Sequence, residues 1–180
     1  MNEISTVGLD IGKKVFQVHG VDCSGAVVVR RELRRRQLRA WFSRLPPCLV
    51  GLEACATAHY WARELSKLGH DVRLIPPAYA KAYVRRNKND PADAAAICEA
   101  VGRPSMRFVA IKTEQQQAAV GIHRVRDLLM KQHTMLRNQL RGLMAEFGVV
   151  AAKGQRGLNE LLAILADPED QRIPNPLREG

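Results

Sequence analysis

The chain has 180 residues, 46% of them hydrophobic, which allows one well-cored globular domain with an appendage. Its 28 Lys and Arg against 18 Asp and Glu give a formal charge of +10, which favours a polyanionic partner, nucleic acid before an anionic membrane. No apolar run reaches the length of a membrane span and no signal-peptide pattern opens the chain. We therefore expect a cytoplasmic protein with no membrane partner.

The cysteines are far apart and form no C-x-x-C pair. They lie in or beside apolar segments, so the sequence favours buried, reduced thiols over disulfides or zinc ligands. These residues are Cys23, Cys48, Cys55 and Cys98.

The start of the chain predicts an antiparallel meander. Residues 4–11 form a predicted buried strand that carries Asp10 at its end, residues 14–21 alternate in the manner of a second strand, and a third begins at 26–29. An unpaired charge within an apolar run is costly, so we expect Asp10 to have a partner.

Residues 30–44 contain seven arginines and a single acid, together with apolar residues at helical spacing. The pattern predicts an amphipathic helix with a basic outer face. Such a face can be merely solvated, but the lack of balancing acids favours contact with phosphates.

Residues 48–53 predict a central strand that ends in a second carboxylate, Glu53. A helix at 58–68 and a strand at 71–75 follow, and then residues 78–88 mix basic side chains with tyrosines. That mixture suits phosphate contact and base stacking, although tyrosines four residues apart also simply pack together. The candidate nucleic-acid-binding residues are Arg34, Arg35, Arg36, Arg39, Lys81, Arg85, Arg86 and Lys88.

A predicted helix after residue 88 begins with two more acids. Asp90 is the expected N-cap, Pro91 the first helical residue, and Asp93 lies one turn further on. Both carboxylates can then point the same way, as a metal site requires. The alternative is an ordinary helix start, in which capping residues serve structure alone.

From 113 to 147 apolar residues recur at steps of three and four, which predicts a helix of about 34 residues and about 50 Å. Such a helix is too long for a compact core, so we expect an antiparallel hairpin or an intermolecular coiled coil. The rest contains one short helix and a tail that is expected to bury little.

The predicted order of elements is that of an α/β, ribonuclease-H-like mixed sheet flanked by helices, followed by the long helix. In that fold Asp10 and Glu53 sit on neighbouring strand ends, and Asp90 and Asp93 face them. Four carboxylates this close need a counter-charge, which a hard divalent cation supplies. Two magnesium ions there would activate water and stabilise the leaving oxygen in phosphoryl transfer.

Four stretches carry a resemblance to a known family. They are residues 8–13 (GLDIGK), 51–62 (GLEACATAHYWA), 68–77 (LGHDVRLIPP) and 88–94 (KNDPADA). From about residue 7 to about residue 150 the sequence resembles the N-terminal part of the DEDD transposases of the IS110 family, nearest to its IS1111 branch. These are recombinases that cut and rejoin DNA.

The resemblance implies that Asp10, Glu53, Asp90 and Asp93 are the magnesium-binding, catalytic tetrad of a RuvC-like domain. It also implies guidance by a bridge RNA and a dimer or tetramer formed through the long helix. We expect three regions: a RuvC-like domain at 1–112, a coiled-coil helix at 113–150, and a short helix with a flexible tail at 151–180.

The family's transposases are nearly twice as long and carry a second domain with a serine thought to attack DNA. We expect this chain to be a truncated form that is incomplete alone. Two other functions remain open: a stand-alone nuclease resembling a Holliday-junction resolvase, which needs only the four acids, and a non-catalytic RNA-binding and dimerisation module.

Overall fold

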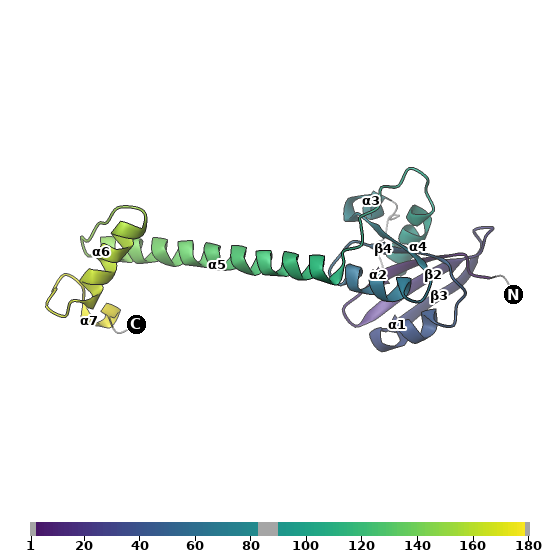
Figure 1. The fold of residues 1–180 in the computed structure, drawn as a ribbon, viewed down its shortest axis with the longest axis horizontal. Helices are drawn as coiled ribbons and strands as arrows, with labels where there is room; N and C mark the ends of the chain where they lie inside the picture. Colours follow the sequence, from purple (N-terminus) through teal and green to yellow (C-terminus); the bar gives the residue numbers. More distant parts are fainter. Residues whose placement is uncertain (1–2, 83–89, 179–180) are drawn as a thin grey trace. The chain divides into compact units, whose positions relative to one another are not determined.

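The computed structural model describes residues 3–82 and 90–178, which form two compact units, Met1–Glu114 and Gln115–Gly180 (Figure 1). The first unit contains β1 (Thr6–Ile11), β2 (Val15–Val21), β3 (Val27–Arg34), α1 (Arg35–Phe42), β4 (Leu49–Glu53), α2 (Ala58–Ser66), β5 (Asp71–Ile75), α3 (Pro77–Ala82) and α4 (Asp90–Val101). The helices that follow are α5 (Glu114–Ala145), α6 (Gln155–Ala166) and α7 (Asn175–Arg178).

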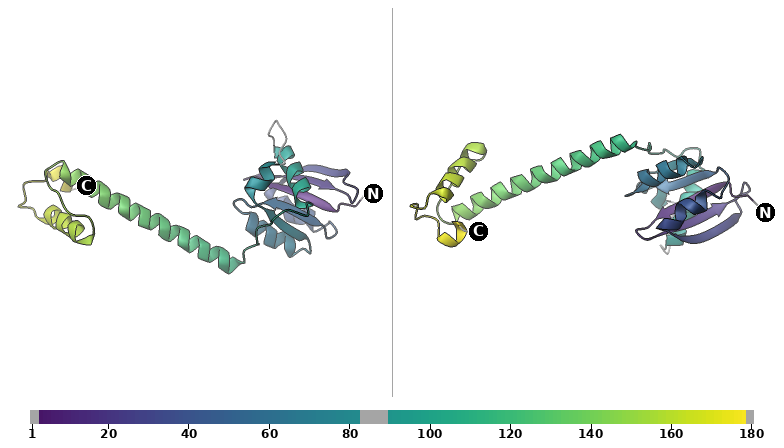
Figure 2. Two further views of the ribbon diagram at one scale, coloured as in Figure 1. Left: turned by 90° about the horizontal axis from the view of Figure 1, so that it is seen from above. Right: turned by 60° about the horizontal axis from the view of Figure 1, so that its bottom comes forward.

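The strands of the described residues form one mixed sheet in the order β3-β2-β1-β4-β5. β1, β2 and β3 are antiparallel neighbours, whereas β4 and β5 run parallel to β1. Helices α1 and α2 cover one face of the sheet and α4 covers the other (Figure 2). The prediction of a ribonuclease-H-like mixed sheet flanked by helices and followed by a long helix is confirmed.

The α1–α2 face of the sheet carries large apolar side chains. Leu9, Phe16 and Leu52 are fully buried there. Phe16 packs edge to face against Trp61 of α2, with ring centroids 5.3 Å apart. This layer supplies the main hydrophobic core of the unit.

The α4 face is instead shaped by two glycines. Gly8 of β1 and Gly51 of β4 are register partners. A Cβ atom on Gly8 would overlap the carbonyl oxygen of Ala94, and one on Gly51 would lie 2.8 Å from Cβ of Val101. Because neither residue has a side chain, α4 lies directly on the backbone of β1 and β4.

The predicted boundary between the third strand and the first helix is wrong. Residues 30–34 extend β3 instead of starting a helix, and Glu32 and Leu33 pair with Gln17 and Phe16 of β2. Leu33 alone of these five residues is buried in the core, and the four charged residues around it are exposed, which fits the edge strand of the sheet. Helix α1 begins only at Arg35.

In the second unit, α5 has 32 residues, close to the predicted 113–147. Its end packs with α6 through Met144, Val149 and Leu161. Ile173 joins this small core and is 2% exposed, although the tail was expected to bury little. Leu177 of α7 packs against the same cluster, so two apolar residues hold the tail against this core.

All four cysteines are free. Cys48 and Cys98 are buried, and burial raises the pKa of each thiol to about 11, so both stay protonated at neutral pH. The prediction of burial is wrong for Cys23, which is exposed in the turn after β2.

Within the described residues, no helix combines the length and apolar character needed to cross a membrane.

Candidate active site

Two of the predicted carboxylates end neighbouring parallel strands. The register of β1 and β4 runs to the pair Leu9 and Leu52, so Asp10 and Glu53 follow at the same level. Each lies two residues after a glycine that faces α4, so both acids belong to the α4 face. Both are half-buried.

Helix α4 runs antiparallel to β1. The Ala94 carbonyl and the Cys98 amide both lie over Gly8, and the Cys98 thiol, at the later of these two positions, donates to the earlier strand residue Thr6 at its carbonyl oxygen, at 3.8 Å. The start of α4 is therefore directed toward the edge of the sheet that carries Asp10. In that first turn Asp93 is half-buried, and its Oδ1 atom is buried without a hydrogen-bond partner in the described part of the chain.

The negative charge at this edge of the sheet affects the pKa of the Cys55 thiol. Burial raises its pKa most, the negative charge of Glu53 raises it further, and Asp10 adds a smaller rise. Two carboxylates from different strands thus act on one thiol. Because its pKa is raised above the usual 9.0, the Cys55 thiol is protonated at neutral pH.

Asp90 opens α4, but its side chain lies outside the described residues, as do Arg85, Arg86 and Lys88. Among the residues that are described, no group of three or more His, Cys, Asp or Glu could hold a metal ion. Asp93 nevertheless fits one, because a buried carboxylate oxygen without a donor is costly and hard divalent cations take oxygen ligands.

The acidic edge continues across the sheet. Gln17 and Glu32 are the successive register partners of Asp10 on β2 and β3, and Gln17 Nε2 donates to Glu32 Oε2 at 3.1 Å. The next register row, Gly8, His19 and Arg30, lies beside a cavity of about 510 Å³ between α4 and the β2–β3 pair.

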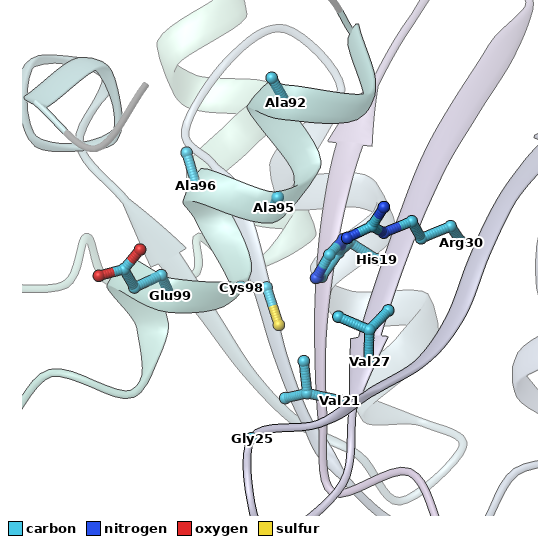
Figure 3. Close-up of a pocket in the computed structure, with 10 residues that line it drawn as sticks. All are labelled: His19, Val21, Gly25, Val27, Arg30, Ala92, Ala95, Ala96, Cys98 and Glu99. Atoms are coloured by element: carbon cyan, nitrogen blue, oxygen red, sulfur yellow. The ribbon is translucent and has the colours of Figure 1, made fainter. Parts of the chain in front are cut away.

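Figure 3 shows this cavity, with His19 and Arg30 side by side on the strands opposite Ala92 and Ala95 of α4. Burial lowers the pKa of His19 and the charge of Arg30 lowers it further, so the imidazole is neutral at neutral pH. The lining therefore combines the Arg30 guanidinium, a neutral imidazole, the Glu99 carboxylate and the Cys98 thiol with small aliphatic side chains.

Two lysines that the sequence reasoning did not select lie at the same edge. Gly12, Lys13 and Lys14 connect β1 to β2 shortly after Asp10, and both lysines are exposed. Neither has an ion-pair partner among the described residues. Their position directly after the acid-bearing strand was the available sequence signal.

Arg35 holds that turn in place. Its amide nitrogen donates to the Lys14 carbonyl at 3.2 Å, and its Nε atom donates to the Lys13 carbonyl at 3.4 Å. Its guanidinium also stacks over the rings of Phe16 and Trp61, 5.1 and 5.6 Å from their centroids. The structure thus gives this predicted nucleic-acid-binding residue a role within the protein.

The other predicted basic residues differ in availability. Arg34 and Arg36 are exposed, without an ion-pair partner in the described part of the chain. Arg39 is exposed too, but its Nη1 atom lies 3.7 Å from the Glu64 carboxylate. Lys81 belongs to α3, and its side chain is not among those described.

Comparison with solved structures finds Thermus thermophilus RuvC in complex with a Holliday junction substrate. It shares 13% sequence identity at a TM-score of 0.38, over 51% of this chain and 88% of that chain. The similarity is too weak to transfer a function or a partner.

Relatives at the sequence level are much closer. The chain is 51% identical over 177 residues to a probable family 20 transposase of Pseudomonas aeruginosa, covering 98% of this chain and 52% of the relative. It is 42% identical to the transposase for insertion sequence element IS1111A of Coxiella burnetii (98% and 50%) and 40% identical to that for IS1328 of Yersinia enterocolitica (97% and 51%).

The chain thus spans about half the length of the curated relatives it matches. A model of the IS110 DEDD transposase family, described as a transposase, matches residues 7–148, well over half of the chain. The chain therefore belongs to the IS110 transposase family.

Proposed function

We propose that this chain is the metal-dependent catalytic part of a transposase that cuts and rejoins DNA at specific sites. Asp10, Glu53, Asp90 and Asp93 are its proposed catalytic residues and the ligands of magnesium. The observation that carries the proposal is the Asp93 Oδ1 atom, which is buried with no donor among the described residues, on a helix directed toward the edge where Asp10 and Glu53 end their strands. The cytoplasm is the proposed location.

Magnesium, when bound, would activate a water molecule or hydroxyl nucleophile and stabilise the leaving oxygen of the phosphodiester. Other residues of the chain position the carboxylates and supply positive charge for this chemistry. Gly8 and Gly51 allow α4 to lie against β1 and β4, so the carboxylates project from packed strands and a packed helix. Lys13 and Lys14 place two cations beside acids that would otherwise repel a phosphodiester.

Recombination by the whole transposase tests the catalytic roles. Asp93→Asn in the full-length protein keeps the side-chain shape, so we expect the fold to persist while DNA cutting and rejoining are lost. Ser105→Ala, a change on an exposed residue after α4, should retain activity. Normal recombination by Asp93→Asn would remove the tetrad from the mechanism.

A guide RNA is the second proposed partner. Arg34 and Arg36 offer two exposed guanidinium groups that no described acid neutralises. Replacing both with Gln should weaken RNA binding and reduce its dependence on salt by about one unit of log–log slope for each lost contact. Arg107→Gln with Arg124→Gln removes the same charge at other exposed sites, and an equal loss there would argue against a specific role.

Helix α5 supports a proposed dimer. Ile122, Leu129, Leu136 and Leu143 recur at intervals of seven residues, and the first three are 70, 58 and 70% exposed. A heptad stripe of this kind is buried in coiled coils, so we propose that a second copy of α5 covers it. Leu129→Lys with Leu136→Lys should yield monomers in analytical ultracentrifugation, whereas an unchanged mass would contradict the pairing.

A further inference from the structure

The second unit contains a polar cavity separate from its small apolar core. The cavity measures about 480 Å³ and lies between the second half of α5 and the loop that leads into α6. The residues around it are Thr134, Arg137, Asn138, Arg141, Lys153 and Gly154. They include three cations and no carboxylate, so the described lining is electrically unbalanced.

Arg137 is the most constrained of these cations. Its Nη2 atom is buried and has no hydrogen-bond partner in the described part of the chain. Leaving a guanidinium N–H without water or an acceptor is costly, so the site suits a ligand that brings acceptor oxygens. Arg141 is held beside it, since its Nη2 atom donates to Asn138 Oδ1 at 2.7 Å.

No acid among the described residues neutralises the positive charge of this cavity. Within the described residues, Arg137, Arg141 and Lys153 take part in no ion pair. Lys153 is exposed in the loop before α6 and lines the cavity, so its flexible side chain can turn the ammonium group toward it.

The start of α6 adds to the positive potential. Its N-cap is Gly154, at φ 99°, which offers no side-chain cap, and its first turn contains no acid. The first N–H groups of such a helix lack intrahelical acceptors, and the helix dipole places partial positive charge there. This feature adds to the positive charge of the site that Arg137, Arg141 and Lys153 already form.

We propose that this cavity binds a phosphate group, supplied by the backbone of a nucleic acid strand. Guanidinium groups donate to two phosphate oxygens at once, which matches Arg137 and Arg141, and Lys153 adds a point charge. A nucleic acid is favoured over a free anion because the chain carries a charge of +10 and belongs to a transposase family. The site lies in a different unit from the proposed carboxylate site and does not depend on it.

The first test is nucleic-acid binding by the full chain. Labelled DNA and RNA duplexes are titrated by fluorescence anisotropy at several salt concentrations, with wild type and Arg137→Gln/Lys153→Gln. We expect weaker binding and a log–log salt slope lower by about 1 to 2, because each lost phosphate contact removes close to one unit. The larger loss among the two duplexes identifies the strand type.

The matched control is Arg124→Gln/Lys131→Gln, which removes the same charge from exposed positions of α5 that do not line the cavity. This control should change the salt dependence of nucleic-acid binding less than Arg137→Gln/Lys153→Gln does. Equal losses in both double variants would overturn the proposal, because net charge alone would then explain binding. Lys153→Gln alone changes an exposed residue and keeps the test valid if Arg137→Gln impairs folding; wild-type binding by Lys153→Gln in that case would also overturn it.

A second measurement separates nucleic acid from a free anion. Inorganic phosphate, compared with chloride at equal ionic strength, should raise the melting temperature of wild type but not of Arg137→Gln/Lys153→Gln. If this shift exists while duplex binding is unchanged by the variant, the ligand is a free anion and the nucleic-acid assignment is wrong. If neither effect exists, the cavity is not a phosphate site. Asp10→Asn/Asp93→Asn should keep both effects, so the two sites fail independently.

Discussion

The two faces of the sheet are built on opposite principles. On the α1–α2 face, large side chains such as Leu9, Phe16 and Leu52 are fully buried in the main core. On the α4 face, the same strands present glycine and polar side chains, and α4 packs against bare backbone. The first face carries the larger apolar core, whereas the second buries a smaller apolar cluster around Ile75, Ile97 and Val101 and carries the half-buried acids beyond its glycines.

The largest expected effect is at the glycine contact. Gly8→Val would push side-chain atoms into the Ala94 carbonyl, which is backbone and cannot move without shifting α4. We expect a loss of more than about 3 kcal/mol in the free energy of unfolding, measured by urea denaturation. Gly121→Ala is the control, because a Cβ added to that exposed helical glycine would meet no atom of another segment within 4 Å, and alanine should stabilise α5 by about 1 kcal/mol. Wild-type stability of Gly8→Val would contradict the close approach of α4.

On the opposite face, Leu9→Ala should cost about 2 to 5 kcal/mol, because it leaves a cavity among fully buried side chains. Because Leu9 lies on the face opposite the acids, we expect the folded variant to show the same rise in melting temperature on addition of magnesium as the wild type. A variant that stays folded but loses that response would show that the two faces are coupled.

The sequence predicted the features that depend on local patterns and missed those that depend on contacts between distant residues. The alternating strands, the apolar helix faces and the acids near the ends of β1 and β4 were visible as local patterns, and so was the length of α5. The end of β3 was not, because the arginine-rich 30–34 segment fits a basic helix until pairing with β2 selects the strand. The internal role of Arg35 depends on Phe16 and Trp61, which are distant in sequence.

The cavity in the second unit was likewise hidden from sequence patterns. Arg137 and Arg141 are one helical turn apart and suggest only a solvated stripe, and Lys153 becomes their neighbour when the loop turns back at Gly148 and Gly154. Ile173 gave no periodic signal, because the tail reaches this core through only two spaced residues, Ile173 and Leu177. Long-range contacts of this kind are decided by tertiary packing.

A smaller effect is expected on acidification. The pKa of His19 is lowered by burial and by Arg30, and that of His59 by burial, Lys112 and Arg63. The folded state therefore takes up these protons less readily than the unfolded state. Their contribution to stability is complete above the usual pKa of 6.5 and falls as the pH drops through 6.5 toward the lowered values.

His19→Gln with His59→Gln should flatten the dependence of melting temperature on pH between neutrality and pH 5. The control is His123→Gln with His133→Gln, two exposed residues of α5. A pH profile that is equally steep in the His19 and His59 variant would assign the loss of stability to other groups.

The most direct measurement is a magnesium titration of the purified chain followed by thermal unfolding, beside Asp10→Asn/Asp93→Asn. A ligand that binds only the folded state must stabilise it, by about 2.7 kcal/mol at a hundred times its dissociation constant. We predict a melting temperature that rises with magnesium in the wild type and not in the double variant. An equal rise in both proteins would place the ion elsewhere and contradict a metal site at Asp10 and Asp93.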